Sequence, residues 1–278
     1  MKVERPHSNF AWREGMEKDE LLLRDLPPDP IPEKVVDALE EAFVRHVGNE
    51  EYLAGMKMVV PGAGKLYGVK VPFLRKMAIE VVSAYKTDND DLWAIALTCW
   101  GQGSREHQLV ALFILAKLKL KPAERWHLGE RFLPDVGNWE SCDQLCMALL
   151  GQALAEDHGY MDVIEGWAGS ENLWVRRAAL VAPVYLRRGK HSENVATDLD
   201  RRTLAICEAL LDDQENYIRK AVDWSVREVI KRHYDLGREW LMAQAGAAPS
   251  RTARTTLKQA AKKLTEADRT AFLTVLEG

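Results

Sequence analysis

The chain has 278 residues, of which 47% are hydrophobic and 29% are charged. These proportions are typical of a globular protein and exclude an intrinsically disordered one. No apolar run approaches the ~20 residues of a membrane-spanning helix, and the first residues lack the apolar stretch of a signal peptide. The four cysteines lack metal-ligand spacing. We therefore expect free thiols in a cytoplasmic protein that binds no metal and no other cofactor.

Charge is distributed unevenly along the chain, although the formal net charge is only −4. Residues 1–51 contain 13 acids and 7 bases, whereas residues 219–263 contain 11 bases and 4 acids. Residues 1–30, which lead into the proline-rich LPPDPIP, predict an acidic extension before a repeat domain over residues 31–278. The basic segment predicts either a binding surface for an anionic partner or an ordinary solvated helix face.

Apolar residues recur at helical spacing over most of the chain. They form single stripes over 32–47 and 72–86, whereas 104–120 is apolar almost all round, as expected of an inner helix capped by Ser104. Further helices are predicted at about 122–133, 138–156, 160–168, 171–188, 198–212, 216–232, 235–246, 250–263 and 265–276. Strand signals are nearly absent.

Two of the predicted helices have matching sequences. Trp174-Val-Arg-Arg-Ala-Ala aligns with Tyr217-Ile-Arg-Lys-Ala-Val at a shift of 43 residues. A period of about 40–47 residues with two helices per unit is typical of HEAT repeats, which stack into a curved solenoid with a concave face. We therefore predict an all-α, HEAT-like (armadillo-like) helical-repeat solenoid.

A tryptophan and an aspartate occur four positions apart in GNWESCDQLC, at Trp139 and Asp143. On a helix they lie one turn apart on one face. Arg177 follows Trp139 by 38 residues and Trp224 follows Arg177 by 47, about one repeat each. A solenoid would thus bring two indoles, which attract cations, to a carboxylate and a guanidinium that can clamp a phosphate. Alternatively, the indoles are ordinary packing residues and Asp143 is the ion-pair partner of Arg177.

Two other patterns are weaker. PGAGKLYG at residues 61–68 resembles a phosphate-binding loop, but its glycine spacing is wrong and neither serine nor threonine follows Lys65. Glu106 and His107 are not followed by a second histidine at helical spacing, so they do not form a zinc-protease motif. We expect His107 to be a surface or partly packed residue.

Four separated motifs, taken in order, resemble the DNA alkylation repair family of AlkD-like HEAT-repeat DNA glycosylases. They are YGVKVPFLRKMA (67–78), NWESCD (138–143), SENLWVRRAAL (170–180) and NYIRKAVDWSVREV (216–229), and the resemblance spans about residues 35–263. The catalytic aspartate of that family matches Asp143, and its two lesion-facing tryptophans match Trp139 and Trp224. Its backbone-contacting arginine matches Arg177.

The resemblance implies a monomeric DNA glycosylase that hydrolyses the N-glycosidic bond of cationic N3- or N7-alkylated purines in duplex DNA, without flipping the base. Such a lesion leaves as a neutral base and needs no general acid, so one carboxylate, Asp143, is sufficient to stabilise the sugar cation and orient water. The enzyme would be cytoplasmic and associated with the nucleoid when it acts on DNA. Its DNA contacts would come from Arg177, Arg219, Lys220, Arg227, Arg251, Arg254 and Lys258.

Two features depart from the family pattern. Gln144 follows the aspartate where the family often has a small residue, and the acidic extension is not part of the family core. Two alternatives therefore stay open. A non-catalytic HEAT-repeat protein that binds branched or damaged DNA would show salt-dependent binding that is indifferent to loss of Asp143. A protein-interaction scaffold would show no DNA affinity even at low salt.

Overall fold

The computed structural model describes residues 21–85 and 89–278. The first twenty residues of the predicted acidic extension lie outside the described residues. Within the described ranges the chain is helical and contains no strand, only an isolated bridge between Val47 and Val69. Contacts divide the chain into two compact units, residues 1–118 and residues 119–278. None of the described helices combines the length and apolar character that crossing a membrane requires.

The first unit contains five helices in its described part: α1 (Pro32–Arg45), α2 (Glu50–Val59), α3 (Val71–Ala84), α4 (Asn89–Gly101) and α5 (Arg105–Leu115). Helix α1 packs against α4, and α3 and α4 both pack against α5. Every residue of α5 is buried, which confirms the predicted inner helix, and Ser104 caps it by accepting the N–H of His107. Helix α2 was not predicted, and it has no buried residue.

The last third of the predicted extension packs against α3. Leu22 and Leu23 are each 3% exposed, and their backbone N–H groups donate to the carboxylate of Glu80. The hydroxyl of Tyr85 donates to the carbonyl oxygen of Pro27 at 2.5 Å. Residues 21–30 are therefore held in the first unit through hydrogen bonds and buried leucines.

The glycine-containing loop at 61–70 is closed around a buried carboxylate. Glu106 accepts hydrogen bonds from the backbone N–H groups of Tyr67, Gly68 and Val69, at 3.0, 3.0 and 3.2 Å. These amides, which would contact phosphate in a phosphate-binding loop, are therefore used inside the unit. The expectation for His107 was wrong. Its side chain is fully buried, bonds the hydroxyl of Ser104 at 2.7 Å and so belongs to the core.

The second unit carries the remaining helices. They are α6 (Pro122–Phe132), η1 (Leu133–Asp135), α7 (Trp139–Leu145), η2 (Cys146–Leu150), α8 (Gly151–Glu156), α9 (Tyr160–Trp167), α10 (Leu173–Val181), η3 (Ala182–Arg188), α11 (Glu193–Ala209), α12 (Asn216–Arg232), α13 (Tyr234–Gly246), α14 (Arg251–Ala260), η4 (Ala261–Lys263) and α15 (Glu266–Glu277). The predicted helix 138–156 is thus one continuous rod, α7–η2–α8, with a π-helical turn in its middle.

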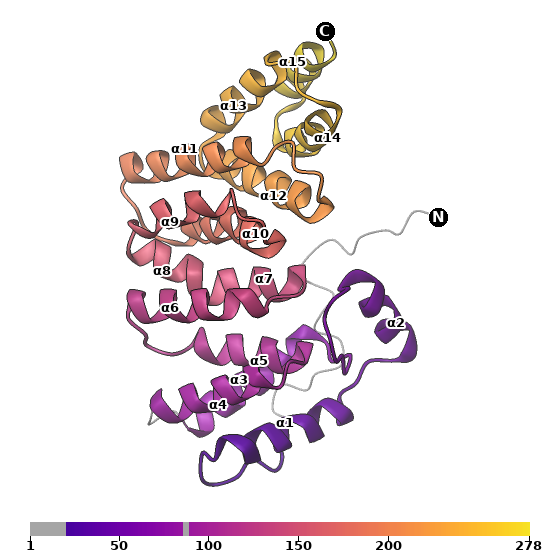
Figure 1. The fold of residues 1–278 in the computed structure, drawn as a ribbon, viewed down its shortest axis with the longest axis vertical. Helices are drawn as coiled ribbons and strands as arrows, with labels where there is room; N and C mark the ends of the chain where they lie inside the picture. The colour runs from indigo at the N-terminus through magenta and orange to yellow at the C-terminus, as the bar shows by residue number, and fades with distance from the viewer. Residues whose placement is uncertain (1–20, 86–88) are drawn as a thin grey trace. The chain divides into compact units, whose positions relative to one another are not determined.

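Helices of the second unit pair and stack as in a helical repeat. Helix α6 packs against α8, α9 against α10, and α11 against α12, while α10 and α14 both pack against α12. Figure 1 shows α7, α10 and α12 as successive rungs of this stack. Gly151 allows α8 to approach η3 closely, because a Cβ atom there would lie 2.8 Å from the carbonyl oxygen of Ala182. The predicted helical-repeat architecture is confirmed, and the four cysteines are free, as expected.

Candidate active site and DNA interface

Helix α7 begins at the predicted tryptophan because Asn138 caps it. The Asn138 side chain accepts hydrogen bonds from the backbone N–H groups of Glu140 and Ser141, both at 3.0 Å. Trp139 is therefore the first helical residue, and Asp143 lies one turn later, about 6 Å along the helix axis. Trp139 is partly exposed, whereas Asp143 is buried.

Asp143 and Arg177 form a buried, two-point ion pair. Nε and Nη2 of Arg177 donate to Oδ1 and Oδ2 of Asp143, each at 2.8 Å. Nη1 of the same guanidinium donates to the carbonyl oxygen of Tyr217 on α12. Arg177 therefore joins α7, α10 and α12, and it fixes the plane of the carboxylate.

Burial changes the ionisation of this pair. Burial raises the pKa of Asp143 above that of an ordinary aspartate, and the guanidinium of Arg177 opposes the rise. Burial also works against the charge of Arg177, but the carboxylate more than offsets it, so the pKa of this arginine lies above its usual value. The site thus contains a permanent cation beside a carboxylate that is protonated more easily than an exposed one.

Trp224 lies on α12, which packs against α10. The hydroxyl of Ser225 donates to the carbonyl oxygen of Leu180 at 2.5 Å and fixes this part of α12 on α10. Trp224 is partly exposed, and its Nε1 donates to Oε1 of Glu228 at 3.2 Å. Since Trp224 follows Tyr217 by seven residues, it lies about 10 Å further along α12 than the carbonyl that Arg177 contacts.

The four residues predicted to form the site therefore lie on three neighbouring helices of one unit. Asp143 and Arg177 are in direct contact, as the ion-pair interpretation predicted. The two tryptophans lie on the helices to either side of α10, and each residue is partly exposed. The arrangement offers two aromatic surfaces and one oriented carboxylate, a combination that can stabilise positive charge.

Two of the predicted DNA-binding residues lie among the first five residues of α12. Arg219 donates to the carbonyl oxygen of Gln214 at 2.9 Å. Lys220 is exposed, with its Nζ 6.0 Å from the ring centroid of Tyr217. Two turns further on, Arg227 forms a two-point ion pair with Asp223, at 2.7 and 3.0 Å.

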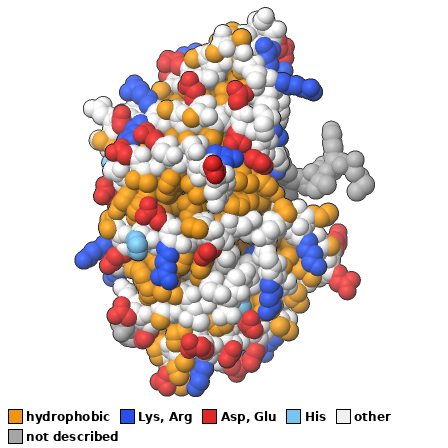
Figure 2. Space-filling view, viewed as in Figure 1, with side chains coloured by type: hydrophobic (Ala, Val, Ile, Leu, Met, Phe, Trp, Pro, Cys, Tyr) orange, Lys and Arg blue, Asp and Glu red, His pale blue; other side chains and the backbone are white. Residues whose placement is uncertain are grey.

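The other three predicted cations lie on α14. Arg251 is exposed, Arg254 donates to the carbonyl oxygen of Leu276 at 2.7 Å, and Lys258 pairs with Glu277 at 2.9 Å. On the face shown in Figure 2, acidic and basic side chains of the described residues are interspersed. A DNA strand that binds these cations would therefore have to compete with protein acceptors for several of them.

Sequence reasoning missed one acidic residue at this site, Glu228. Its signal was its spacing, because Glu228 follows Trp224 by four residues, as Asp143 follows Trp139. It also missed the carbonyl oxygen of Tyr217, for which no side-chain pattern could give a signal.

Comparisons with known proteins agree with the fold and the motifs. The family model described as DNA alkylation repair enzyme matches residues 41–264, which include the four residues of the site. The chain belongs to this family. The protein is therefore a DNA repair enzyme.

A solved structure described as a predicted DNA alkylation repair enzyme from Enterococcus faecalis is similar in fold. The two chains share 20% sequence identity with a TM-score of 0.61, over 80% of this chain and 99% of that chain. No curated protein sequence gives a significant match. The structural likeness supports the helical-repeat fold of this family member.

Proposed function

We propose that the protein is a DNA glycosylase that removes cationic N3- or N7-alkylated purines from duplex DNA as a metal-free monomer. The observation that carries the proposal is the oriented Asp143 carboxylate, held by Arg177 between two helices that each carry a partly exposed tryptophan. Family membership makes alkylated DNA the substrate class to test first.

The reaction breaks the bond between C1′ of the sugar and the purine nitrogen. An alkylated purine with a formal positive charge takes the bonding electrons and leaves as a neutral base, so no group has to protonate it. Positive charge moves to the sugar as the bond lengthens, and Asp143 stabilises it through space. Water then adds to C1′, and its proton passes to the carboxylate and on to solvent.

Arg177 fixes the carboxylate and limits its negative charge at the same time. Both oxygens of Asp143 accept from Arg177, but 12% of the side chain is still exposed, and this part would face the sugar. The indoles of Trp139 and Trp224 add cation–π stabilisation of about 0.5–2 kcal/mol each. Rigid placement of these groups avoids a reorganisation cost when the charge develops.

Release of the damaged base from a duplex that contains one 7-methylguanine tests the proposal. Under single-turnover conditions we expect base release by the unmodified protein and a loss of about 100-fold or more in Asp143→Asn. Asp213→Asn is the matched control, because Asp213 pairs with the neighbouring Arg176 at 2.9 Å and is not part of the site. No release by the unmodified protein, or undiminished release by Asp143→Asn, would contradict the proposal.

A non-catalytic role in binding damaged or branched DNA is the second candidate. It is favoured by one observation, that both oxygens of Asp143 already accept hydrogen bonds from Arg177. This role predicts binding that weakens steeply with salt, no base release, and equal affinity in Asp143→Asn.

A further inference from the structure

A second carboxylate lies directly beside Trp224. Glu228 is 7% exposed and lies one turn after Trp224 on α12. Its Oε1 accepts from Nε1 of Trp224 at 3.2 Å and from Nζ of Lys231 at 2.6 Å, and its Oε2 accepts from Nη1 of Arg187. A buried carboxylate is stable only when it is paired and hydrogen-bonded, and these three donors meet that condition.

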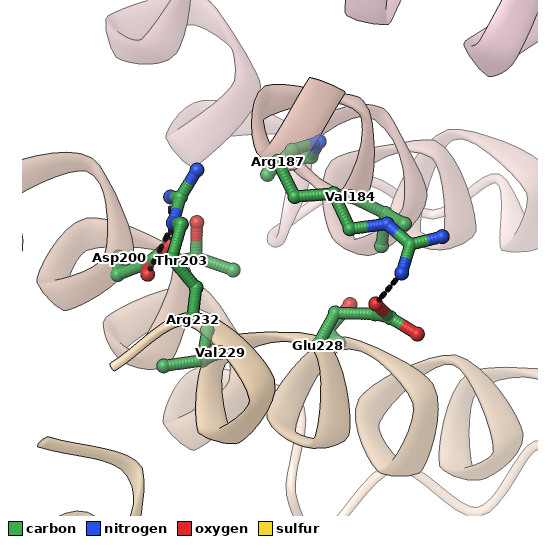
Figure 3. A pocket seen from close by; sticks show the side chains of 9 residues that line it. Val184, Arg187, Asp200, Thr203, Glu228, Val229 and Arg232 are labelled. Atoms are coloured by element: carbon green, nitrogen blue, oxygen red, sulfur yellow. Dashed lines mark hydrogen bonds and ion pairs between the residues drawn. The ribbon is translucent and has the colours of Figure 1, made fainter. Parts of the chain in front are cut away.

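The donors fix Glu228 from two helical segments. Figure 3 shows Arg187 extending from η3 to Glu228 on one side of a small pocket, while Arg232 on the other side reaches Asp200. Arg187 on η3 holds Oε2, and Lys231 on α12 holds Oε1, the oxygen that also accepts from Trp224. Both oxygens of the carboxylate are therefore fixed. The indole N–H has one acceptor in a defined place, which selects one orientation of the ring.

We propose that Glu228 is a positioning residue that sets the orientation of Trp224 and makes its ring a better surface for a cation. This inference rests on the proposed function, since it assigns the ring a role beside the cationic lesion or the sugar. An N–H group that donates to an anion shifts electron density into the ring, and the attraction between a ring and a cation grows with the negative charge on the ring face.

The contact itself can be observed without any reaction. With ¹⁵N-labelled tryptophan, the indole N–H signal of Trp224 is the one that disappears in Trp224→Phe. We expect this signal to shift and to exchange faster with solvent in Glu228→Ala, and to shift less in Glu228→Gln, whose amide oxygen still accepts a hydrogen bond. The same Trp224 indole signal in the unmodified protein, Glu228→Ala and Glu228→Gln would overturn the proposal.

The effect on the reaction is measured by single-turnover release of 7-methylguanine. We expect Glu228→Ala to slow the release by about 2- to 30-fold, which is the cation–π range converted to a rate, and Glu228→Gln to slow it less. Affinity for undamaged duplex should stay the same or increase, because the substitution removes a negative charge. A matching loss of rate and affinity, or an unchanged rate, would overturn the proposal.

Two further variants separate positioning from general stability. Arg187→Met removes one donor that fixes Glu228, so the Trp224 signal should shift and the rate should fall, both by less than in Glu228→Ala. Glu165→Gln breaks the ion pair of Glu165 with Arg202, at 2.7 and 2.8 Å, elsewhere in the same unit, and should change neither. If the unmodified protein releases no base, the proposed function is contradicted. The orientation of Trp224 by Glu228 is still tested, because the indole signal reports it without any reaction.

Discussion

The two tryptophans of the site have the same local pattern and different surroundings. Each is followed four residues later by an acid, Asp143 after Trp139 and Glu228 after Trp224, and each acid pairs with an arginine of the α10–η3 rod. Arg177 is buried, with 6% of its side chain exposed, whereas 39% of the Arg187 side chain is exposed. The second acid bonds its own tryptophan, because Oε1 of Glu228 accepts from Nε1 of Trp224 at 3.2 Å.

The difference shows how one spacing can support two tasks. Asp143 has both oxygens fixed by a buried guanidinium, so it is oriented for a direct electrostatic role. Glu228 divides its oxygens between the indole and two half-exposed cations, so its effect passes through Trp224. Four experiments, in order of decreasing expected effect, test this division.

The largest effect should follow from removal of the buried arginine. Arg177→Met leaves Asp143 buried without its partner and should lower the free energy of unfolding by about 3 kcal/mol. Arg187→Met should cost less than about 1 kcal/mol, because Arg187 is half-exposed and Lys231 still pairs with Glu228. Urea denaturation measures both. Equal losses of unfolding free energy would contradict the proposed difference between the two ion pairs. The double variant Asp143→Asn with Arg177→Met should lose less unfolding free energy than the sum of the two single variants.

The pH dependence of base release should report the ionisation of Asp143. Burial raises the pKa of Asp143, and the ionised form is the active one. The rate should therefore fall as the pH is lowered through this raised pKa, by about tenfold for each pH unit below it. The midpoint should lie above that of an exposed aspartate and should be unchanged in Glu228→Gln. A midpoint that changes in Glu228→Gln would contradict the assignment of the pH dependence to Asp143 alone.

A smaller effect is expected at the helix starts that position the tryptophans. Asn138→Ala removes the side-chain cap of α7 and should cost about 1 kcal/mol of stability. Glu215→Ala at the start of α12 should have little effect, because Glu215 makes no capping bond with its side chain. Thermal unfolding of the two variants measures the contrast, and a loss in Glu215→Ala as large as that in Asn138→Ala would contradict it.

The smallest effect concerns phosphate contacts at the two ends of α12. Lys220 is exposed near Tyr217, whereas Lys231 is paired with Glu228 at 2.6 Å. Lys220→Met should reduce the slope of log affinity against log salt by about 0.9, the value for one lost phosphate contact. Lys231→Met should change the slope less, since the charge of Lys231 is already balanced. Titration of a labelled duplex at several salt concentrations measures both slopes. Equal changes in slope would contradict the proposed difference between Lys220 and Lys231.

The sequence by itself determined the helical class and the order of the repeats. Periodic apolar stripes predicted most helices within a few residues, and the matching segments at Trp174 and Tyr217 predicted the repeat. Helix α2 was missed although Tyr52, Met56 and Val59 recur at helical spacing, and the structure buries none of its residues. His107 was placed wrongly because the sequence does not show which polar residues a neighbouring segment will cover.

For the site, the sequence named the four residues, and only the tertiary structure decided how they are connected. Spacing placed Trp139 and Arg177 about one repeat apart, but the two-point ion pair of Arg177 with Asp143 and the bond to the Tyr217 carbonyl depend on how α7, α10 and α12 pack. The role of Glu228 was equally invisible, because Arg187 reaches it across 41 residues of chain. Local propensity follows from neighbouring residues, whereas burial and pairing of charges depend on contacts between distant ones.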